Sequence, residues 1–180
     1  MTHPLAFAAP ARRALLQGVL AMAVVVLASN VLVQFQINDW LTWGAITYPF
    51  AFLVSELANR SHGPHHARRI AWAGFAVAVA ASLALAPLRI ALASGMAFLC
   101  SQLLDIQVFH RLRRGRWWRA PLVATLLAAV LDTALFWSIA FAGEDLPWVT
   151  LAIGDLGVKL GMGVALLLPF RMWIGRRAAC

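Results

Sequence analysis

Charged residues are scarce in this sequence: Asp, Glu, Lys and Arg make up 12% of its 180 residues, and only 7 residues are acidic. Hydrophobic residues make up 62%. So few charged side chains could not cover the surface of a water-soluble globule of this length. A helical bundle in a lipid bilayer can expose such a sequence, because its outer face meets hydrocarbon chains and not water. The composition therefore predicts a membrane protein.

The sequence has only two cysteines, and they exclude a disulfide framework. Cys100 lies in an apolar stretch and Cys180 is the last residue, so the two form neither a paired motif nor a metal motif. Three histidines within residues 62–66 lack acidic or cysteine partners and flank a Gly-Pro pair, which predicts a solvated basic loop. We therefore expect no metal site and no cofactor.

Motifs for nucleotide binding and for hydrolysis are also absent. The phosphate-binding pattern Gly-x-x-x-x-Gly-Lys-Ser/Thr does not occur, and neither do His-Glu-x-x-His or Gly-x-Ser-x-Gly. We therefore predict no catalytic residues and no enzyme. Energy for any transport would have to come from gradients, from metabolic trapping or from a separate subunit.

Long apolar stretches account for almost the whole sequence. A transmembrane helix needs about 20 mostly apolar residues. The sequence therefore predicts an all-α membrane protein with six transmembrane helices in a single domain, residues 1–180. The six stretches are 14–37, 40–59, 69–86, 88–110, 120–142 and 146–172.

Positive charges gather at alternate ends of these stretches. Cytoplasmic loops of membrane proteins are enriched in Lys and Arg, so we predict that both termini are cytoplasmic and that the chain crosses the membrane six times. The clusters are Arg12-Arg13, then Arg60, Arg68 and Arg69, then Arg111, Arg113, Arg114, Arg116 and Arg119, then Arg171, Arg176 and Arg177.

The formal net charge of +8 follows from this topology. A nucleic-acid partner would need a basic stripe on a folded surface. Here Trp117 and Trp118 beside the basic loop favour an anchor at the membrane interface instead. We expect membrane lipid as a partner and no nucleic acid.

Several ionisable residues fall inside the apolar stretches, where such a side chain costs on the order of 3 kcal/mol at the centre of a spanning helix. Several together normally line a cavity or a transport route. At a rise of about 1.5 Å per residue, Asp132, Asp155 and Lys159 should lie near the middle of the membrane, with Glu56 and Asp105 toward its cytoplasmic side. The sequence thus predicts a polar pathway through the bundle.

Asp155 and Lys159 are four residues apart, so their side chains share one face of a helix, with the acid preceding the base. One interpretation is a structural ion pair, which in a bundle interior would add little stability. The other is direct participation in transport. The sequence leaves both interpretations open.

Gln102 and Asp105 are one helical turn apart on the fourth predicted helix, with Ser101 beside them. An amide and a carboxylate together can accept hydrogen bonds from the N–H edge of a purine-like base and donate one to its carbonyl. These residues are therefore candidates for binding a planar heterocycle.

Arg89 stands near the outer boundary of its predicted helix, with an apolar run after it. Its side chain either snorkels to lipid phosphate or pairs with an inward carboxylate and acts as a gate. The turn fixed by Pro87 just before it favours the gate.

Polar and aromatic residues also recur along the chain in a specific order. They are Thr42-Trp43-Gly44-Ala45, residues 48–60, 67–70, 89–94, 102–105 and 108–113, Trp117-Trp118, Asp132-Thr133, and Asp155 with Lys159. Their order and spacing resemble the queuosine precursor transporter family of vitamin uptake transporters over nearly the whole chain. The sequence departs from the usual family pattern at Ser55-Glu56, where a threonine and an aspartate are usual, but it retains the hydroxyl and the carboxylate.

The resemblance implies a six-helix inner-membrane importer of 7-deazaguanines, namely preQ0, preQ1 or queuine, which feed the queuosine modification of transfer RNA. A 7-deazaguanine offers an N1–H and an exocyclic amine that match a carboxylate, and preQ1 adds an aminomethyl cation that a second carboxylate can neutralise. The predicted substrate-binding residues are Glu56, Asn59, Gln102, Asp105, Asp132, Asp155 and Lys159, with stacking by Trp43, Phe50, Phe52 or Phe109.

Two classes of transporter fit these observations. The chain is either a self-sufficient carrier, for which a homodimer is permitted, or the substrate-binding subunit of an energy-coupling vitamin transporter whose ATPases are separate chains. A third interpretation, a structural membrane protein or an unrecognised enzyme, requires that the buried acids merely pair with one another.

Overall fold

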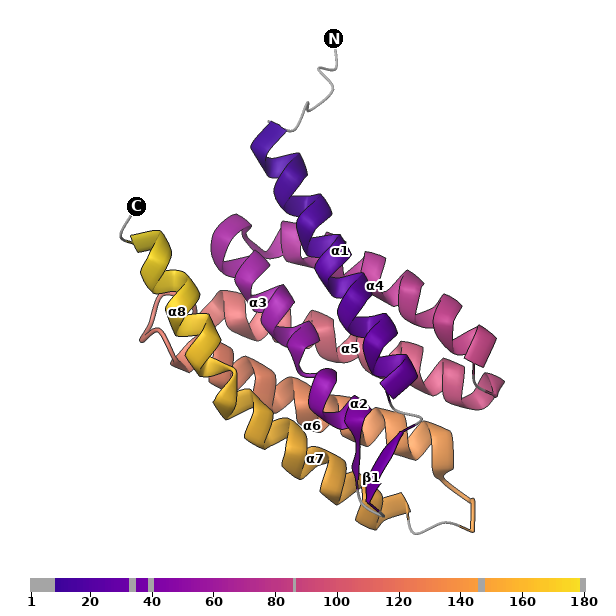
Figure 1. The fold of residues 1–180 in the computed structure, drawn as a ribbon. Helices are drawn as coiled ribbons and strands as arrows, with labels where there is room; N and C mark the ends of the chain where they lie inside the picture. The colour runs from indigo at the N-terminus through magenta and orange to yellow at the C-terminus, as the bar shows by residue number, and fades with distance from the viewer. Residues whose placement is uncertain (1–8, 33–34, 39–40, 86, 146–147, 179–180) are drawn as a thin grey trace.

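The computed structural model describes residues 9–32, 35–38, 41–85, 87–145 and 148–178, which form eight helices and two short strands (Figure 1). α2 continues into α3 and α7 into α8, so the helices form six rods, in agreement with the six predicted stretches. The elements are α1 (Ala9–Leu32), β1 (Gln36–Asn38), β2 (Leu41–Thr42), α2 (Trp43–Thr47), α3 (Phe50–His62), α4 (Pro64–Leu85), α5 (Leu88–Leu112), α6 (Arg119–Phe141), α7 (Trp148–Ala165) and α8 (Leu167–Ala178).

Five of these rods are long and apolar enough to cross a membrane. The sixth, formed by α2 and α3, is interrupted: α3 has 13 residues, which span about 20 Å at a rise of about 1.5 Å per residue, less than the ~30 Å hydrocarbon core. By its helices the chain is a multi-pass membrane protein. The five candidate spans are Arg12–Ser29, Pro64–Ala84, Leu88–Leu112, Arg119–Phe141 and Trp148–Gly175.

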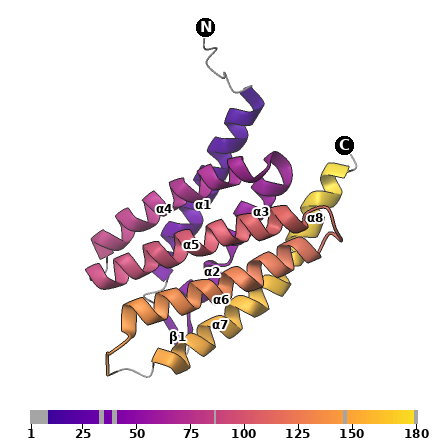
Figure 2. The same cartoon turned by 180° about the vertical axis from the view of Figure 1, so that it is seen from behind.

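The interrupted rod lies among the long helices. α3 packs against α1, α4, α5 and α6, whereas α2 packs against α1 and α7. The long helices pack in the order α1 on α4, α4 on α5, α5 on α6 and α6 on α7. Figures 1 and 2 show the start of α1, the end of α8, the α3–α4 turn and the α5–α6 connection at one end of the bundle. The β1–β2 hairpin and the α4–α5 and α6–α7 connections lie at the other end.

The prediction of a first helix at 14–37 was wrong at its carboxyl end. α1 ends at Leu32, and Gln36–Asn38 pairs in an antiparallel manner with Leu41–Thr42. Backbone groups beyond the end of a helix still need hydrogen-bond partners, and the two strands supply them to each other where the polar side chains of β1 interrupt the apolar run. The described fold is therefore helical except for this one two-stranded hairpin.

The predicted second helix, 40–59, is interrupted at Tyr48-Pro49, between α2 and α3 (Figure 1). Proline has no backbone N–H for the carbonyl four residues earlier, and its ring disfavours helical geometry in the residue before it. The Thr47 hydroxyl just before the break lies 3.2 Å from the Trp43 carbonyl oxygen, to which it can donate. Discontinuous helices commonly mark the binding sites of transporters.

Helix α4 begins before the predicted stretch 69–86. Gly63 turns the chain with a φ of 85°, and α4 starts at Pro64, so His65 and His66 lie on a helix and the prediction of a loop there was wrong. Glycine tolerates a positive φ and proline suits the first turn of a helix, which together produce this tight connection.

The last predicted helix, 146–172, is divided, whereas the two before it are confirmed. α7 ends at Ala165, and Pro169 in α8 has no N–H for the Ala165 carbonyl, so the helical hydrogen bonding is interrupted there. The stretches 88–110 and 120–142 match α5 and α6 closely.

Candidate functional site

Buried polar side chains form two clusters, and every predicted substrate-binding residue belongs to one of them. Both clusters draw residues from the interrupted rod, from α5 and from α6, and the first also draws on α7. The Lys159 cluster comprises Tyr48, Ser101, Asp132, Thr133, Asp155 and Lys159. The Asp105 cluster comprises Ser55, Glu56, Asn59, Gln102, Asp105 and Thr125.

Lys159 is the only lysine in the chain, and it is buried. Its Nζ donates to Asp155 Oδ2 at 2.5 Å and to Asp132 Oδ2 at 2.8 Å. The Thr133 hydroxyl donates to Asp155 Oδ2 at 3.0 Å. The expected pairing of Asp155 with Lys159 is therefore present, and Asp132 joins it from α6.

Asp132 connects this ion pair to the interrupted rod. Its Oδ1 accepts hydrogen bonds from the Tyr48 hydroxyl at 2.8 Å and from the Ser101 hydroxyl at 3.2 Å. Lys159 Nζ also lies 5.3 Å from the centroid of the Tyr48 ring, within the range of a cation–π contact. Each charged group of the Lys159 cluster thus has hydrogen-bond partners within the protein.

The Asp105 cluster is only partly hydrogen-bonded. The Ser55 hydroxyl donates to Gln102 Oε1, which holds the amide across the interface between α3 and α5. From α6, the Thr125 hydroxyl donates to Glu56 Oε1 at 2.8 Å. These two bonds fix one oxygen of the amide and one of the carboxyl group.

Four buried polar atoms of this cluster have no hydrogen-bond partner among the described residues: Asp105 Oδ1 and Oδ2, Gln102 Nε2 and Asn59 Oδ1. All three residues are 0% exposed. Asn59 uses only its Nδ2, which donates to the Ile106 carbonyl at 2.8 Å. A buried polar group without a partner costs about 1–3 kcal/mol, so four together indicate a place built for a ligand more than for stability.

The two clusters also differ in charge. Within the described ranges, no salt bridge joins Glu56 or Asp105 to a cation. Arg60, one turn after Glu56, donates instead to the Arg113 carbonyl at 2.5 Å. The residues that the structure describes contain no group of three or more His, Cys, Asp or Glu side chains that could hold a metal ion. The Asp105 cluster is therefore acidic, whereas the Lys159 cluster contains its own cation.

Helical spacing explains why these residues meet. Ser55, Glu56 and Asn59 lie within one turn of α3, and Gln102 and Asp105 lie within one turn of α5, so each set occupies one face of its helix. Small residues allow the helices to approach closely. On α6 the buried alanines are Ala120, Ala124, Ala128, Ala129 and Ala140.

The hydroxyl groups that hold these acids and amides were not among the predicted site residues. Thr125 lies seven residues before Asp132, which is two helical turns on the same face of α6, and this spacing could have found it. Tyr48 is the only tyrosine and directly precedes Pro49, but its partner could not be read from spacing. The hydroxyl residues are Tyr48, Ser55, Ser101, Thr125 and Thr133.

Two of the four aromatic residues predicted to stack on a ligand are buried. The Phe52 ring packs edge-on against Tyr48, with centroids 5.8 Å apart, and so adjoins the Lys159 cluster. Phe109 packs edge-on against Phe170 at 5.9 Å. The side chains of Trp43 and Phe50 are exposed, so they would contact a ligand inside the bundle only after turning inward.

Arg89 lies outside both clusters. Its Nη1 donates to the Glu144 carboxylate at 2.6 Å, and its Nη2 and Nε donate to the carbonyls of Ala142 and Ile139 at 2.6 and 2.9 Å. Both partners of the salt bridge are about half exposed, at 45% and 56%. The arginine therefore caps the carboxyl end of α6 and pairs with an exposed acid.

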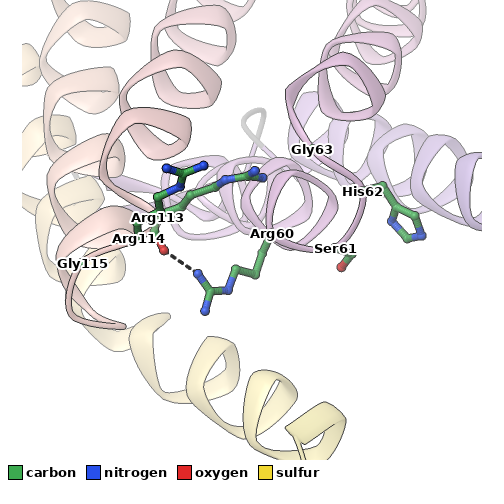
Figure 3. Close-up of a pocket in the computed structure, with 7 residues that line it drawn as sticks. All are labelled: Arg60, Ser61, His62, Gly63, Arg113, Arg114 and Gly115. Carbon is green, nitrogen blue, oxygen red and sulfur yellow. Dashed lines mark hydrogen bonds between the residues drawn. The ribbon is translucent and has the colours of Figure 1, made fainter.

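A basic hollow of about 610 Å³ opens at the end of the bundle that carries the termini (Figure 3). Arg113 Nη1 donates to the Asn59 carbonyl at 3.4 Å, and with the bond from Arg60 it ties the end of α3 to the end of α5. The hollow is lined by Arg60, Ser61, His62, Gly63, Arg113, Arg114 and Gly115. Through Asn59, it adjoins the Asp105 cluster.

Comparison with known proteins identifies the family. A family model described as "Putative vitamin uptake transporter" matches residues 42–87 and 82–174. The chain is 35% identical over 176 residues to the "Queuosine precursor transporter" of Escherichia coli (strain K12), a match that covers 81% of this chain and 79% of that protein.

Two further relatives carry the name "Probable queuosine precursor transporter". That of Haemophilus influenzae is 34% identical over 154 residues, which cover 71% of this chain and 66% of the relative. That of Bacillus subtilis (strain 168) is 25% identical over 160 residues, which cover 72% and 69%. No solved structure matches the chain. The chain therefore belongs to the queuosine precursor transporter family, as its motifs predicted, and it is a transporter and not an enzyme.

Proposed function

We propose that this protein imports queuosine precursors, the 7-deazaguanines preQ0, preQ1 or queuine, across the bacterial inner membrane and binds them in the Asp105 cluster. The observation that carries the proposal is the set of unpaired, buried polar atoms on Asp105, Gln102 and Asn59. The charged groups of the Lys159 cluster are already paired within the protein. A ligand therefore gains more hydrogen bonds in the Asp105 cluster.

The pattern of donors and acceptors supports this choice of ligand. Because Ser55 occupies Gln102 Oε1, the free group of the amide is the Nε2 donor. Asp105 offers two acceptors and Asn59 offers one. A 7-deazaguanine presents the complementary edge, with a carbonyl acceptor beside an N1–H and an exocyclic amine. Gln102 would donate to the carbonyl, while Asp105 would accept from the two N–H groups.

The ligand would enter when helices separate, since the unpaired atoms are sealed from solvent. The break at Tyr48-Pro49 makes α3 the segment best suited to move, as in other transporters with discontinuous helices. Phe52, one turn before Ser55 and Glu56, is the predicted aromatic residue best placed to cover the planar face of the ligand.

We propose that the Lys159 cluster has a structural role and does not bind the ligand directly. Asp132, Asp155 and Lys159 hold α6 and α7 together and keep their charges paired in the bundle interior. Their participation in transport remains our second proposal for them, because any movement of α7 relative to α6 has to break these bonds.

We further propose that both termini are cytoplasmic. All of the predicted arginine clusters belong to segments at one end of the bundle, where the start of α1, the end of α8 and the α3–α4 and α5–α6 connections lie (Figure 1). The positive-inside rule assigns that end to the cytoplasm. Cysteine accessibility at Ser61 and at Glu144, measured in intact cells with a membrane-impermeant reagent, tests this: labelling at Glu144→Cys alone is expected.

We propose a self-sufficient carrier, with the substrate-binding subunit of an energy-coupling transporter as the alternative; both would hold the donors and acceptors for a ligand within this one chain. Uptake by the purified protein in liposomes, without ATPase chains, is the expected result, and copurification of ATPase subunits would favour the alternative. A homodimer would have room at Gly157 and Gly161 on α7, where an added Cβ would meet nothing within 4 Å.

The ligand is tested by thermal stabilisation of the detergent-purified protein with preQ0, preQ1, queuine, guanine and biotin. We expect stabilisation by the 7-deazaguanines and none by biotin. Asp105→Asn should abolish it, because an amide cannot accept both N–H groups of the base. Glu144→Gln, an exposed acid outside both clusters, serves as the matched control and should retain stabilisation. Equal responses in these two variants would contradict the site.

A further inference from the structure

Glu56 and Asp105 bring two carboxyl groups together in the bundle interior. Their side chains come from α3 and α5 and are 3% and 0% exposed. The hydrogen bonds from Ser55 to Gln102 and from Asn59 to the Ile106 carbonyl join the turn of α3 that carries Glu56 to the turn of α5 that carries Asp105. Two carboxylates that share a buried site cannot both ionise readily, because their charges repel and because burial disfavours each charge. The pair therefore requires a positive charge nearby, which is supplied either by another side chain or by a ligand.

The surrounding helices do not supply that charge. On α3, Arg60 donates to the Arg113 carbonyl, and on α7, Lys159 is bound to Asp132 and Asp155. α6 contributes the neutral hydroxyl of Thr125, and α4 packs against the neighbouring turn of α5 through alanines. The other titratable or charged side chains on the helices packed around the pair are Arg12 and Arg13 on α1, His62 on α3, His65, His66, Arg68 and Arg69 on α4, Arg89, Cys100, His110 and Arg111 on α5, and Arg119 on α6.

The unpaired atoms of the Asp105 cluster likewise indicate that hydrogen-bond donors are lacking there. Asp105 and Asn59 present three unpaired acceptors, whereas Gln102 Nε2 is the single unpaired donor in the set. A carboxyl group that binds a proton becomes a donor. One proton on the pair would thus relieve the charge repulsion and provide a hydrogen atom that an acceptor of the cluster lacks. A proton also needs no cavity, so it can bind to these atoms although they are sealed inside the bundle.

We propose that Glu56 and Asp105 form a proton-binding site, which holds one proton when no substrate is bound and releases it when a cationic substrate enters. The identity of that substrate rests on the proposed function. The aminomethyl ammonium of preQ1 would take the place of the proton beside Glu56, while Asp105 accepts from the edge of the base. The displaced proton passes to water, and no covalent bond of the substrate changes.

This exchange distinguishes two substrates that share the same ring. preQ0 carries a neutral cyano group in place of the aminomethyl cation, so it leaves the proton on the pair. Release of one proton makes the affinity for preQ1 rise by about tenfold per pH unit while the empty pair is protonated. The affinity for preQ0 should stay nearly constant over the same range, because no proton is exchanged.

Infrared spectroscopy of the purified protein without ligand tests the proton site independently of the substrate. The carbonyl band of a protonated carboxyl group is expected at neutral pH, and it should change in Glu56→Gln and in Asp105→Asn. Asp155→Asn, which alters an acid already paired with Lys159, should leave the band unchanged. If no such band depends on Glu56 or Asp105, the proton site is overturned.

Calorimetry in two buffers of different ionisation enthalpy then counts the protons released on binding. We expect about one proton for preQ1 and none for preQ0 in the intact protein, and none for preQ1 in Glu56→Gln. If preQ1 binds without proton release, the exchange is overturned while the proposed function stands. If neither compound binds and queuine does not bind either, the proposed function fails, and the infrared result alone decides whether the pair holds a proton.

Discussion

The Tyr48 hydroxyl donates to Asp132 Oδ1 at 2.8 Å, although 84 positions separate the two residues. Tyr48 stands at the break of the interrupted rod, and the other oxygen of Asp132 binds Lys159 on α7. This contact joins the segment best suited to move to the two helices that pack beside it. Any displacement of the break relative to α6 therefore has to release the tyrosine from the aspartate.

Removal of the lysine should harm folding more than removal of one of its partners. Lys159→Met leaves Asp132 and Asp155 as two unpaired buried acids, and breaking a buried pair in this way costs about 3–5 kcal/mol. Asp155→Asn leaves Lys159 with Asp132 and should cost much less. Thermal melting in detergent measures the difference. Equal losses of melting temperature in the two variants would mean that Lys159 does not neutralise both Asp132 and Asp155.

Gly163 offers a precise test of how α7 supports the Asp105 cluster. A Cβ at this position would come within 3.0 Å of Thr125 Cγ2, and the Thr125 hydroxyl is the group that holds Glu56. Gly163→Ala should therefore displace that hydroxyl and weaken 7-deazaguanine binding. Gly161→Ala, two residues earlier with nothing within 4 Å of the added carbon, is the matched control. Identical affinities would show that Thr125 does not position Glu56 for the ligand.

The exposed ion pair at the other end of the bundle should contribute little through its charge. A surface salt bridge is typically worth about 0–1 kcal/mol, so Glu144→Gln should hardly change the melting temperature. Arg89→Gln also loses two hydrogen bonds to carbonyls at the end of α6 and should be the more destabilising variant. A gate at Arg89 would instead reveal itself as altered uptake in a variant of unchanged stability.

Pro49→Ala should separate binding from movement. Alanine supplies the backbone N–H that proline lacks, so α2 and α3 can join into a continuous helix. We expect slower uptake into liposomes with the affinity for preQ1 retained, because the Asp105 cluster begins a turn and a half later. Pro169→Ala, which repairs the interruption between α7 and α8, controls for a general effect of helix continuity. Slower uptake in both variants would argue against a special role of the first break.

The sequence identified the polar residues that gather in the two clusters, but not their hydrogen-bond partners. Ionisable and amide side chains in apolar stretches are costly, and this cost alone identified Glu56, Asp105, Asp132 and Lys159 as functional candidates. The spacing of four residues also predicted the contact between Asp155 and Lys159. The helix breaks were missed, although Pro49 and Pro169 carried the signal, because hydropathy averages over single residues.

Composition and charge by themselves determined that this chain is a helical membrane protein with polar residues inside its spans, since both follow from the chemistry of single side chains and their order along the chain. Only the tertiary structure decided that Asp132 binds Lys159 and Tyr48 while Asp105 lacks a partner. Contacts between helices depend on which faces meet, and in a bundle that is apolar on nearly every face the sequence pattern does not distinguish one face from another.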